Sequence, residues 1–137
     1  MNHKDTKAQR ETISNDLNEL SRQVVDAVFH IHKALGPGLL ESVYEACLCH
    51  ELKKRGIAFQ QQVVLPVVYD GLEIATGLRL DLWVESKLIV ELKAVEKLHE
   101  VHKAQMMTYM KLTETRLGLL VNFNVPVIKD GIKRIIL

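Results

Sequence analysis

The chain has 137 residues, with 18 Lys and Arg against 17 Asp and Glu and a net charge of +1. Hydrophobic residues make up 47% and charged residues 26%, which excludes intrinsic disorder and a strongly basic nucleic-acid binder, so any nucleic-acid contact must come from a local patch. The length fits one domain of about 100–150 residues, which can bury a core without disulfides or a structural metal.

Residues 1–12 are polar and charged, and we expect a loose N-terminal arm there, followed by a single domain over residues 13–137. No apolar run approaches the ~18–20 residues that span a bilayer, and no secretory signal is evident. Cys47 and Cys49 are two residues apart on a predicted helix, so their side chains splay by ~200°, which is poor geometry for a disulfide, and no second Cys/His pair accompanies them at zinc-ligand spacing. We therefore expect reduced thiols, a cytoplasmic location and no membrane partner.

Two helices are predicted at the start of the domain. Apolar residues recur every three or four positions over residues 13–35 and form the stripe of a long amphipathic helix, which Gly36-Pro37-Gly38 ends. The second helix covers residues 40–55 and stops at Gly56. The stripe of the first helix is longer than a sandwich of this size needs, so one interpretation is a homo-oligomer built through it.

Strand patterns follow. Residues 59–69 and 72–84 are joined by a tight turn at Asp70-Gly71; Pro66 indicates an edge or a bulge, and Gly77 a second irregularity. Further elements are predicted at residues 87–94 (strand), 99–112 (helix), 117–123 (buried strand) and 132–136 (strand), with a turn at Lys129-Asp130-Gly131. The order α-α-β-β-β-α-β-β predicts an α/β sandwich with a mixed sheet.

The hairpin over residues 79–93 carries the chemistry. Leu78, Leu80, Leu82 and Val84 are expected on one face, and Arg79, Asp81, Trp83 and Glu85 on the other. Pairing apolar with apolar residues sets Leu82 against Val90 and Asp81 against Glu91, with Glu85-Ser86-Lys87 as the loop. Two like charges then face each other at about 5 Å, which a divalent cation would turn into an attraction. Neighbouring registers of the same parity remain open.

Two carboxylates and Lys93, on the same side as Glu91, suit metal-assisted phosphodiester cleavage. Hard oxygen ligands select Mg²⁺ or Mn²⁺. Such an ion polarises the phosphate and lowers the pKa of a bound water, and an ammonium stabilises the developing negative charge. The competing interpretation is an exposed strand face with an ordinary mixture of Glu and Lys.

Two helices add polar groups. Glu41 shares the stripe of Tyr44, which is an unusual place for a carboxylate, although an acidic group also interacts well with a helix N-terminus. Gln105 and Tyr109 share a face of the third helix, and for His102, one turn earlier, a polar helix flank is the favoured interpretation. Basic residues also gather along this helix, which indicates either phosphate contacts or a solvated face: Lys97, His99, His102, Lys103 and Lys111.

These motifs together resemble a known family. Residues 38–44 fit the pattern GxxExxY, and with Asp81, Glu91-Leu92-Lys93 and the segment from Ala104-Gln105 to Tyr109 the chain resembles the GxxExxY proteins of the PD-(D/E)XK nuclease superfamily. The resemblance implies the restriction-endonuclease-like α-β-β-β-α-β core, a mixed central sheet flanked by helices. It also implies Asp81 and Glu91 as metal ligands, Lys93 as the catalytic lysine, Glu41 as the helical acidic residue and Gln105 as the polar residue of the later helix. Leu80 stands where the superfamily's name has proline.

The predicted function is a Mg²⁺- or Mn²⁺-dependent nuclease-like enzyme acting on a DNA or RNA phosphodiester. The alternative is a catalytically weak or inactive module on a nuclease fold, which binds nucleic acid or another protein. The near-neutral charge and the lack of an aromatic platform favour that alternative, whereas Asp81, Glu91 and Lys93 together favour the enzyme.

Overall fold

Two amphipathic segments form helices α2 (Asn15–Leu35) and α3 (Glu41–Lys54) in the computed structural model, which describes residues 13–137. The Ser14 hydroxyl accepts a hydrogen bond from the backbone N–H of Leu17 at 3.1 Å and caps the start of α2. Gly36, with a φ of 67°, ends α2 where the sequence predicts it. The predicted polar arm lies outside the described residues.

The five-stranded sheet has the order β1-β2-β3-β4-β5. β3 and β4 are parallel and every other neighbouring pair is antiparallel, so the sheet is mixed as predicted. The remaining elements are β1 (Phe59–Tyr69), β2 (Leu72–Val84), β3 (Leu88–Lys93), α4 (Glu100–Thr113), β4 (Leu117–Asn122), the short 3₁₀ helix η1 (Ile128–Gly131) and β5 (Ile132–Ile136).

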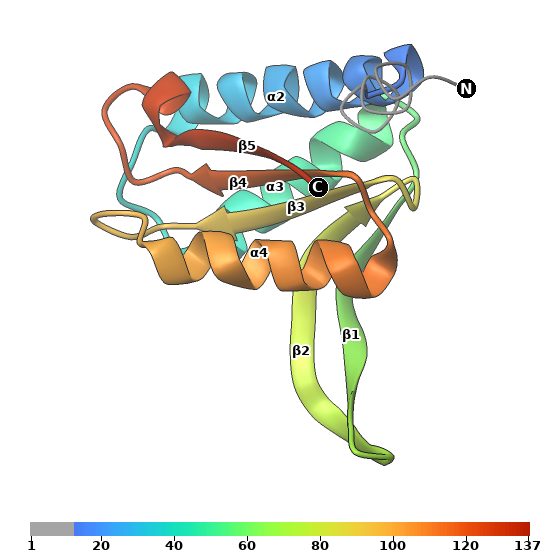
Figure 1. Cartoon of the computed structure of the whole chain (residues 1–137). Coiled ribbons are helices and arrows are strands. Elements are labelled where there is room, and N and C mark those ends of the chain that lie inside the picture. The colour runs from blue at the N-terminus through green and yellow to red at the C-terminus, as the bar shows by residue number, and fades with distance from the viewer. Residues whose placement is uncertain (1–12) are drawn as a thin grey trace, which may run out of the picture.

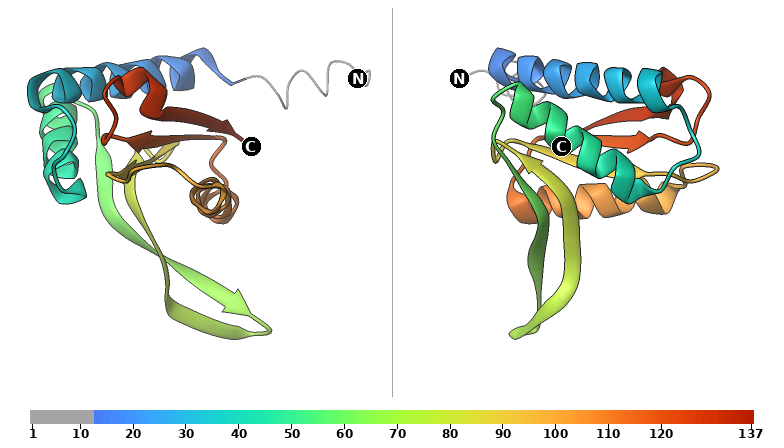
Figure 2. Two further views of the ribbon diagram at one scale, coloured as in Figure 1. Left: turned by 90° about the vertical axis from the view of Figure 1, so that its left-hand side faces the viewer. Right: turned by 180° about the vertical axis from the view of Figure 1, so that it is seen from behind.

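Helices cover both faces of the sheet. α2 and α3 lie on one face and α4 on the other (Figures 1 and 2). The stripe of α2 is buried from Ile13 to Ile31, and only Leu35 at its end stays 43% exposed. The expectation that this helix keeps an unused apolar stripe for an oligomer is therefore wrong, because the stripe covers the sheet. Among the described residues, no helix is long and apolar enough to cross a membrane.

β1 and β2 form a hairpin that leaves the body of the molecule (Figure 1). Pro66 lies on the edge strand, at a register shift where residues 75–77 of β2 stand against this one residue of β1, so both the edge and the bulge predictions are confirmed. Asp70 and Gly71, with φ angles of 50° and 78°, make the predicted tight turn.

β2 changes faces at Asp81, which corrects the predicted alternation. Leu82 and Val84 pack in the core under α2 and α3, whereas Leu80 packs with the side chains of α4 on the opposite side of the sheet. The reason lies in the neighbouring strand, where Gln62 of β1 has a left-handed φ of 53° and interrupts the pairing with β2 between Gln61 and Val63. The two strands bend there together, and Asp81 is at the bend.

Candidate active site

The two acidic residues meet where β2 and β3 stop pairing through their main chains. The register Leu82↔Val90 is as predicted, with residues 85–87 as the loop. Beyond it, the backbone N–H of Asp81 donates to Oε1 of Glu91 at 2.7 Å, and the N–H of Leu92 donates to Oδ2 of Asp81 at 2.8 Å. Each carboxylate thus takes a main-chain donor from the other strand, which fixes both side chains.

Burial makes this pair electrostatically costly. Glu91 is 4% exposed; burial, and then the negative charge of Asp81, raise its pKa to about 8. Burial also raises the pKa of Asp81, against the effect of the Leu92 N–H. Two close carboxylates in a poorly solvated position disfavour each other's ionised form. A nearby positive charge would therefore stabilise the ionised form of the pair.

Lys93 supplies part of that charge. It is half-buried at the end of β3, and its ammonium lowers the pKa values of both Asp81 and Glu91 without overcoming the effect of burial. Its carbonyl accepts the N–H of Phe123 at 2.9 Å, which ties this strand end to β4. Lysine and the two carboxylates thus share one site.

The residues of the GxxExxY pattern shape the loop before α3. Gly38 has a φ of 101°, which favours glycine. The Tyr44 hydroxyl donates to the carbonyl of Gly36 at 2.6 Å and accepts from the N–H of Leu39 at 3.2 Å, while its ring stacks on Phe123 at 4.2 Å. The tyrosine therefore closes the loop and joins it to the strand end beside Lys93.

Glu41 begins α3 and reaches the same strand end. Its Oε1 accepts the backbone N–H of Ala94, the residue after Lys93, at 3.2 Å. Its side chain is exposed, so it is not held inward on the stripe with Tyr44 as the helical spacing suggested. It lies on the solvent side of the end of β3, one residue beyond Lys93.

α4 brings its polar residues to the other side. Tyr109 is buried, with hydrogen bonds to the Arg79 backbone and the Gln105 side chain; burial, and then the charges of Glu91 and Asp81, raise its pKa to about 12. Gln105 itself is exposed, and Tyr109 is the residue it bonds. His102 accepts the N–H of His99 at 3.0 Å and caps the helix. This local role agrees with the interpretation of His102 as part of a polar helix flank. Burial, and then Lys93, lower the pKa of His102.

A third carboxylate, Glu45, was missed by the sequence reasoning. Its two oxygens accept the side-chain amides of Gln61 at 2.6 Å and Gln62 at 2.7 Å, and the Gln62 amide also donates to Oδ1 of Asp81 at 3.4 Å. Glu45 also raises the pKa of Asp81 through its charge. Its position one helical turn after Glu41 was the available signal.

The donor set fits a hard divalent cation. Asp81 and Glu91 offer carboxylate oxygens, and their raised pKa values mark a place where a cation would be stabilising. Within residues 13–137 no group of three or more His, Cys, Asp or Glu is arranged to hold a metal ion. Magnesium sites often use only one or two carboxylates and complete their shell with water and substrate phosphate.

Fold and site together define an α/β protein of the nuclease type. Its acidic pair and lysine lie at the open end of the β2–β3 hairpin, away from the loop of residues 85–87. A sequence model of the PD-(D/E)XK nuclease superfamily matches residues 18–135, and the chain belongs to that superfamily. The observed sheet and helices are consistent with its restriction-endonuclease-like fold. No curated protein and no solved structure matched the chain.

Proposed function

We propose that this chain is a divalent-metal-dependent nuclease of the GxxExxY group, with a single catalytic domain over residues 13–137, and that it cleaves a phosphodiester bond in DNA or RNA. The superfamily supports nuclease-like activity on nucleic acid. The observation that carries the proposal is the buried pair Asp81 and Glu91, whose carboxylates replace main-chain pairing between two strands. We place the protein in the cytoplasm, since both cysteines are free thiols.

Asp81 and Glu91 would hold the ion, and Mg²⁺ or Mn²⁺ suits their oxygen donors. When bound, such an ion supplies Lewis-acid polarisation of the phosphate and a more acidic water. Both carboxylates are fixed by backbone N–H groups, so little reorganisation is needed to bind it. Glu91 would hold the ion in its ionised form, because a ligand carboxylate must be deprotonated.

The chain's own residues do the rest. Lys93 places an ammonium beside the carboxylates, where it orients the attacking water and stabilises the negative charge that builds on the phosphate. Glu41 holds the strand end through Ala94 and so positions Lys93. Gln105, bonded to Tyr109 at the rim, offers an amide to the substrate backbone.

One observation favours a second candidate, a module on a nuclease fold with weak or no catalysis that binds nucleic acid or another protein. The described residues bring only two carboxylates into direct hydrogen-bonded contact with the opposite strand, and no metal-holding group of three. A binding module would keep affinity for nucleic acid and lack turnover.

Lys93→Ala separates these candidates. The purified protein is incubated with single- and double-stranded DNA and RNA in Mg²⁺, in Mn²⁺ and in chelator. We expect cleavage only with metal, and a loss of about 10²–10³-fold in Lys93→Ala, a typical size for removing one electrostatic stabiliser. Binding should change much less, since one phosphate contact among several contributes modestly.

Two further variants sharpen the comparison. Lys93→Arg should restore activity only in part, because a planar guanidinium does not replace a compact ammonium. Lys129→Ala removes an exposed lysine of η1 and should cleave like the parent. If the parent binds these substrates and cuts none of them with either metal, the enzyme proposal fails and the binding module stands.

A further inference from the structure

The hairpin extension, residues 62–80, leaves the sheet without a third strand. β3 pairs with β2 only from Leu82 to Val84, so beyond this point β1 and β2 have only each other as neighbours (Figures 1 and 2). A two-stranded ribbon is marginally stable alone in water, and its open edges present unpaired backbone groups. The extension therefore has the character of a segment that is covered by a partner.

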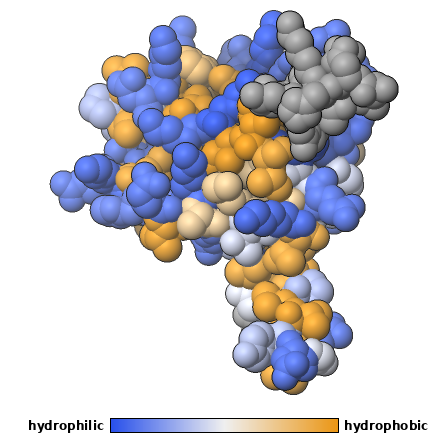
Figure 3. Space-filling view, in the orientation of Figure 1, coloured by the Kyte–Doolittle hydropathy of each residue, from blue (hydrophilic) through white to orange (hydrophobic). Residues whose placement is uncertain are grey.

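One face of the extension is apolar from base to tip. Near the base, the cross-strand pair Leu65↔Leu78 packs against the cluster under α4. Further out, the pair Tyr69↔Leu72 is 73% and 60% exposed. Figure 3 shows apolar residues continuing along the extension away from the body. The apolar face that is packed at the base therefore continues along the extension, where its side chains are exposed to solvent.

The charge of the extension disfavours nucleic acid as its partner. Between residues 62 and 80 the charged residues are Asp70, Glu73 and Arg79, and the tip carries only the two acidic ones. Phosphate backbones are bound by lysine and arginine, and exposed strand edges are usually protected by lysine. A surface that is complementary to this acidic, apolar tip is therefore apolar and basic.

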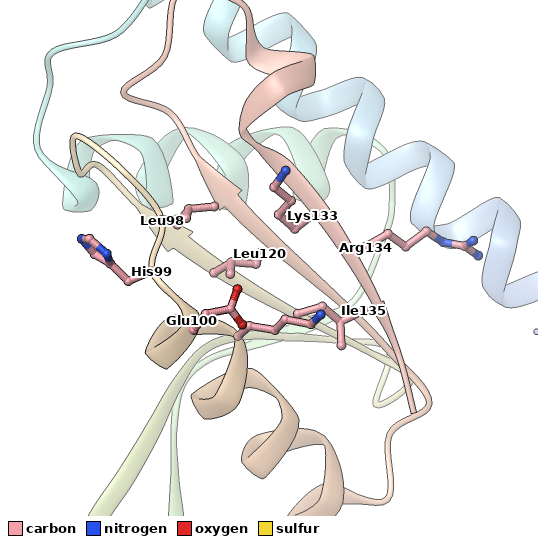
Figure 4. A pocket seen from close by; sticks show the side chains of 8 residues that line it. Leu98, His99, Glu100, Leu120, Lys133, Arg134 and Ile135 are labelled. Carbon is pink, nitrogen blue, oxygen red and sulfur yellow. The ribbon is translucent and has the colours of Figure 1, made fainter.

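The same chain carries such a surface. A groove of about 270 Å³ lies between the start of α4 and β5, with Leu98, Leu120 and Ile135 among its lining residues and Lys103 and Lys133 as cations. His99 and Glu100 also line it (Figure 4). Arg134 points away from it toward α2 (Figure 4), where it bonds the side chain of Asn18.

We propose that the tip of the hairpin extension docks into this groove on a second copy of the chain, with the Tyr69↔Leu72 face on the groove floor and Asp70 of the turn beside the lysines, while Glu73, paired with Val68, lies on the opposite face of the ribbon. A second copy donates its own tip to the first in return, which closes a two-fold dimer. A ribbon about 20 Å long and about 10 Å wide covers roughly 200 Å², and two reciprocal contacts bury roughly 800 Å² in total. That is below a standard stable interface, so the dimer should dissociate on dilution.

Sedimentation velocity of the full chain from micromolar to millimolar concentration tests the proposal. We expect the parent to shift from monomer to dimer as the concentration rises. Asp70→Lys and Lys133→Glu should each weaken dimerisation by about tenfold or more, because each places like charges in contact. Lys129→Glu makes the same charge change outside the groove and should dimerise like the parent.

Mixing the two charge variants gives the most specific result. In the mixed dimer each tip meets a groove of opposite charge, so an equimolar mixture of Asp70→Lys and Lys133→Glu should recover association that neither has alone. Circular dichroism confirms that each variant is folded. A parent that stays monomeric at every concentration, variants that dimerise unchanged, or a mixture that fails to recover would each overturn the proposal.

Discussion

Burial links the protonation of Glu91 to the stability of the fold. The pKa of this carboxyl is about 8 in the folded protein against an ordinary 4.5, so the metal-free fold favours its neutral form. The sign follows from linkage: the contribution is fully present below about pH 4.5 and is lost as the pH rises through about 8. At about 1.4 kcal/mol per pKa unit, the loss amounts to up to about 5 kcal/mol.

Glu91→Gln should remove this pH dependence. In chelator, the parent should lose free energy of unfolding between about pH 5 and about pH 8, whereas the variant should stay nearly level and be the more stable protein at the upper end. Urea unfolding at several pH values measures both. Glu19→Gln, an exposed glutamate paired with Arg22, is the matched control. A parent whose stability does not fall over this range would contradict the proposed burial cost.

Glu45 acts on Asp81 through Gln62. Its carboxylate holds the Gln62 amide at 2.7 Å, and the same amide reaches Asp81. Glu45→Gln should lower cleavage by about tenfold or more, as outer-shell partners of metal ligands typically do, with little change in stability. Gln62→Ala should reproduce the loss and Gln61→Ala should not, since Gln61 bonds Glu45 alone. Equal losses in both glutamine variants would show that Glu45 acts otherwise. Kinetics with varied Mn²⁺ make the comparison.

At the scale of elements, the loop between α2 and α3 depends on one hydroxyl. Tyr44→Phe keeps the stack on Phe123 but removes the bonds to Gly36 and Leu39. The backbone groups of half-buried Gly36 and exposed Leu39 then lose a partner, and we expect a cost of about 0.5–1.5 kcal/mol in the free energy of unfolding. Tyr69→Phe, at a 73% exposed position, should be nearly neutral. Similar unfolding midpoints in urea for both variants would contradict this role.

The elements were largely predictable because their signals are local. Strands β1, β2 and β5 begin and end where alternation and turn residues place them, and the helices differ from prediction by one or two residues at an end. The meeting of Asp81 with Glu91 was predictable from the register of β2 on β3, because only one parity of that register pairs apolar with apolar residues. These features need no knowledge of distant contacts.

Other features depend on contacts that the sequence does not signal. The face change between Leu80 and Leu82 follows from the left-handed backbone of Gln62, and glutamine is not a residue type that marks such a conformation. Glu45 meets Gln62 across 17 positions of the chain. The stripe of α2 was interpreted as excess because its cover, the sheet, is assembled from segments far along the sequence.

At the scale of the whole molecule, side chains from three layers meet at one end of β3: α3, the sheet and α4. α3 contributes Glu41 and Glu45 from one side, α4 contributes Gln105 and Tyr109 from the other, and β1 contributes Gln62. The carboxylate pair lies between them with less positive charge than negative. A bound cation would offset this excess of negative charge and stabilise the fold further.

The most direct test is the melting temperature of the parent and of Asp81→Asn, measured in chelator and in millimolar Mn²⁺ at neutral pH. If Asp81 and Glu91 share a cation, Mn²⁺ should raise the melting temperature of the parent, by RT ln(1 + [Mn²⁺]/Kd) in free energy, and should leave Asp81→Asn unchanged. In chelator, Asp81→Asn should melt no lower than the parent, because it removes a carboxylate whose ionised form is disfavoured by burial. A parent that melts at the same temperature with and without Mn²⁺, or a variant that shifts as much as the parent, would contradict a metal centre at this pair.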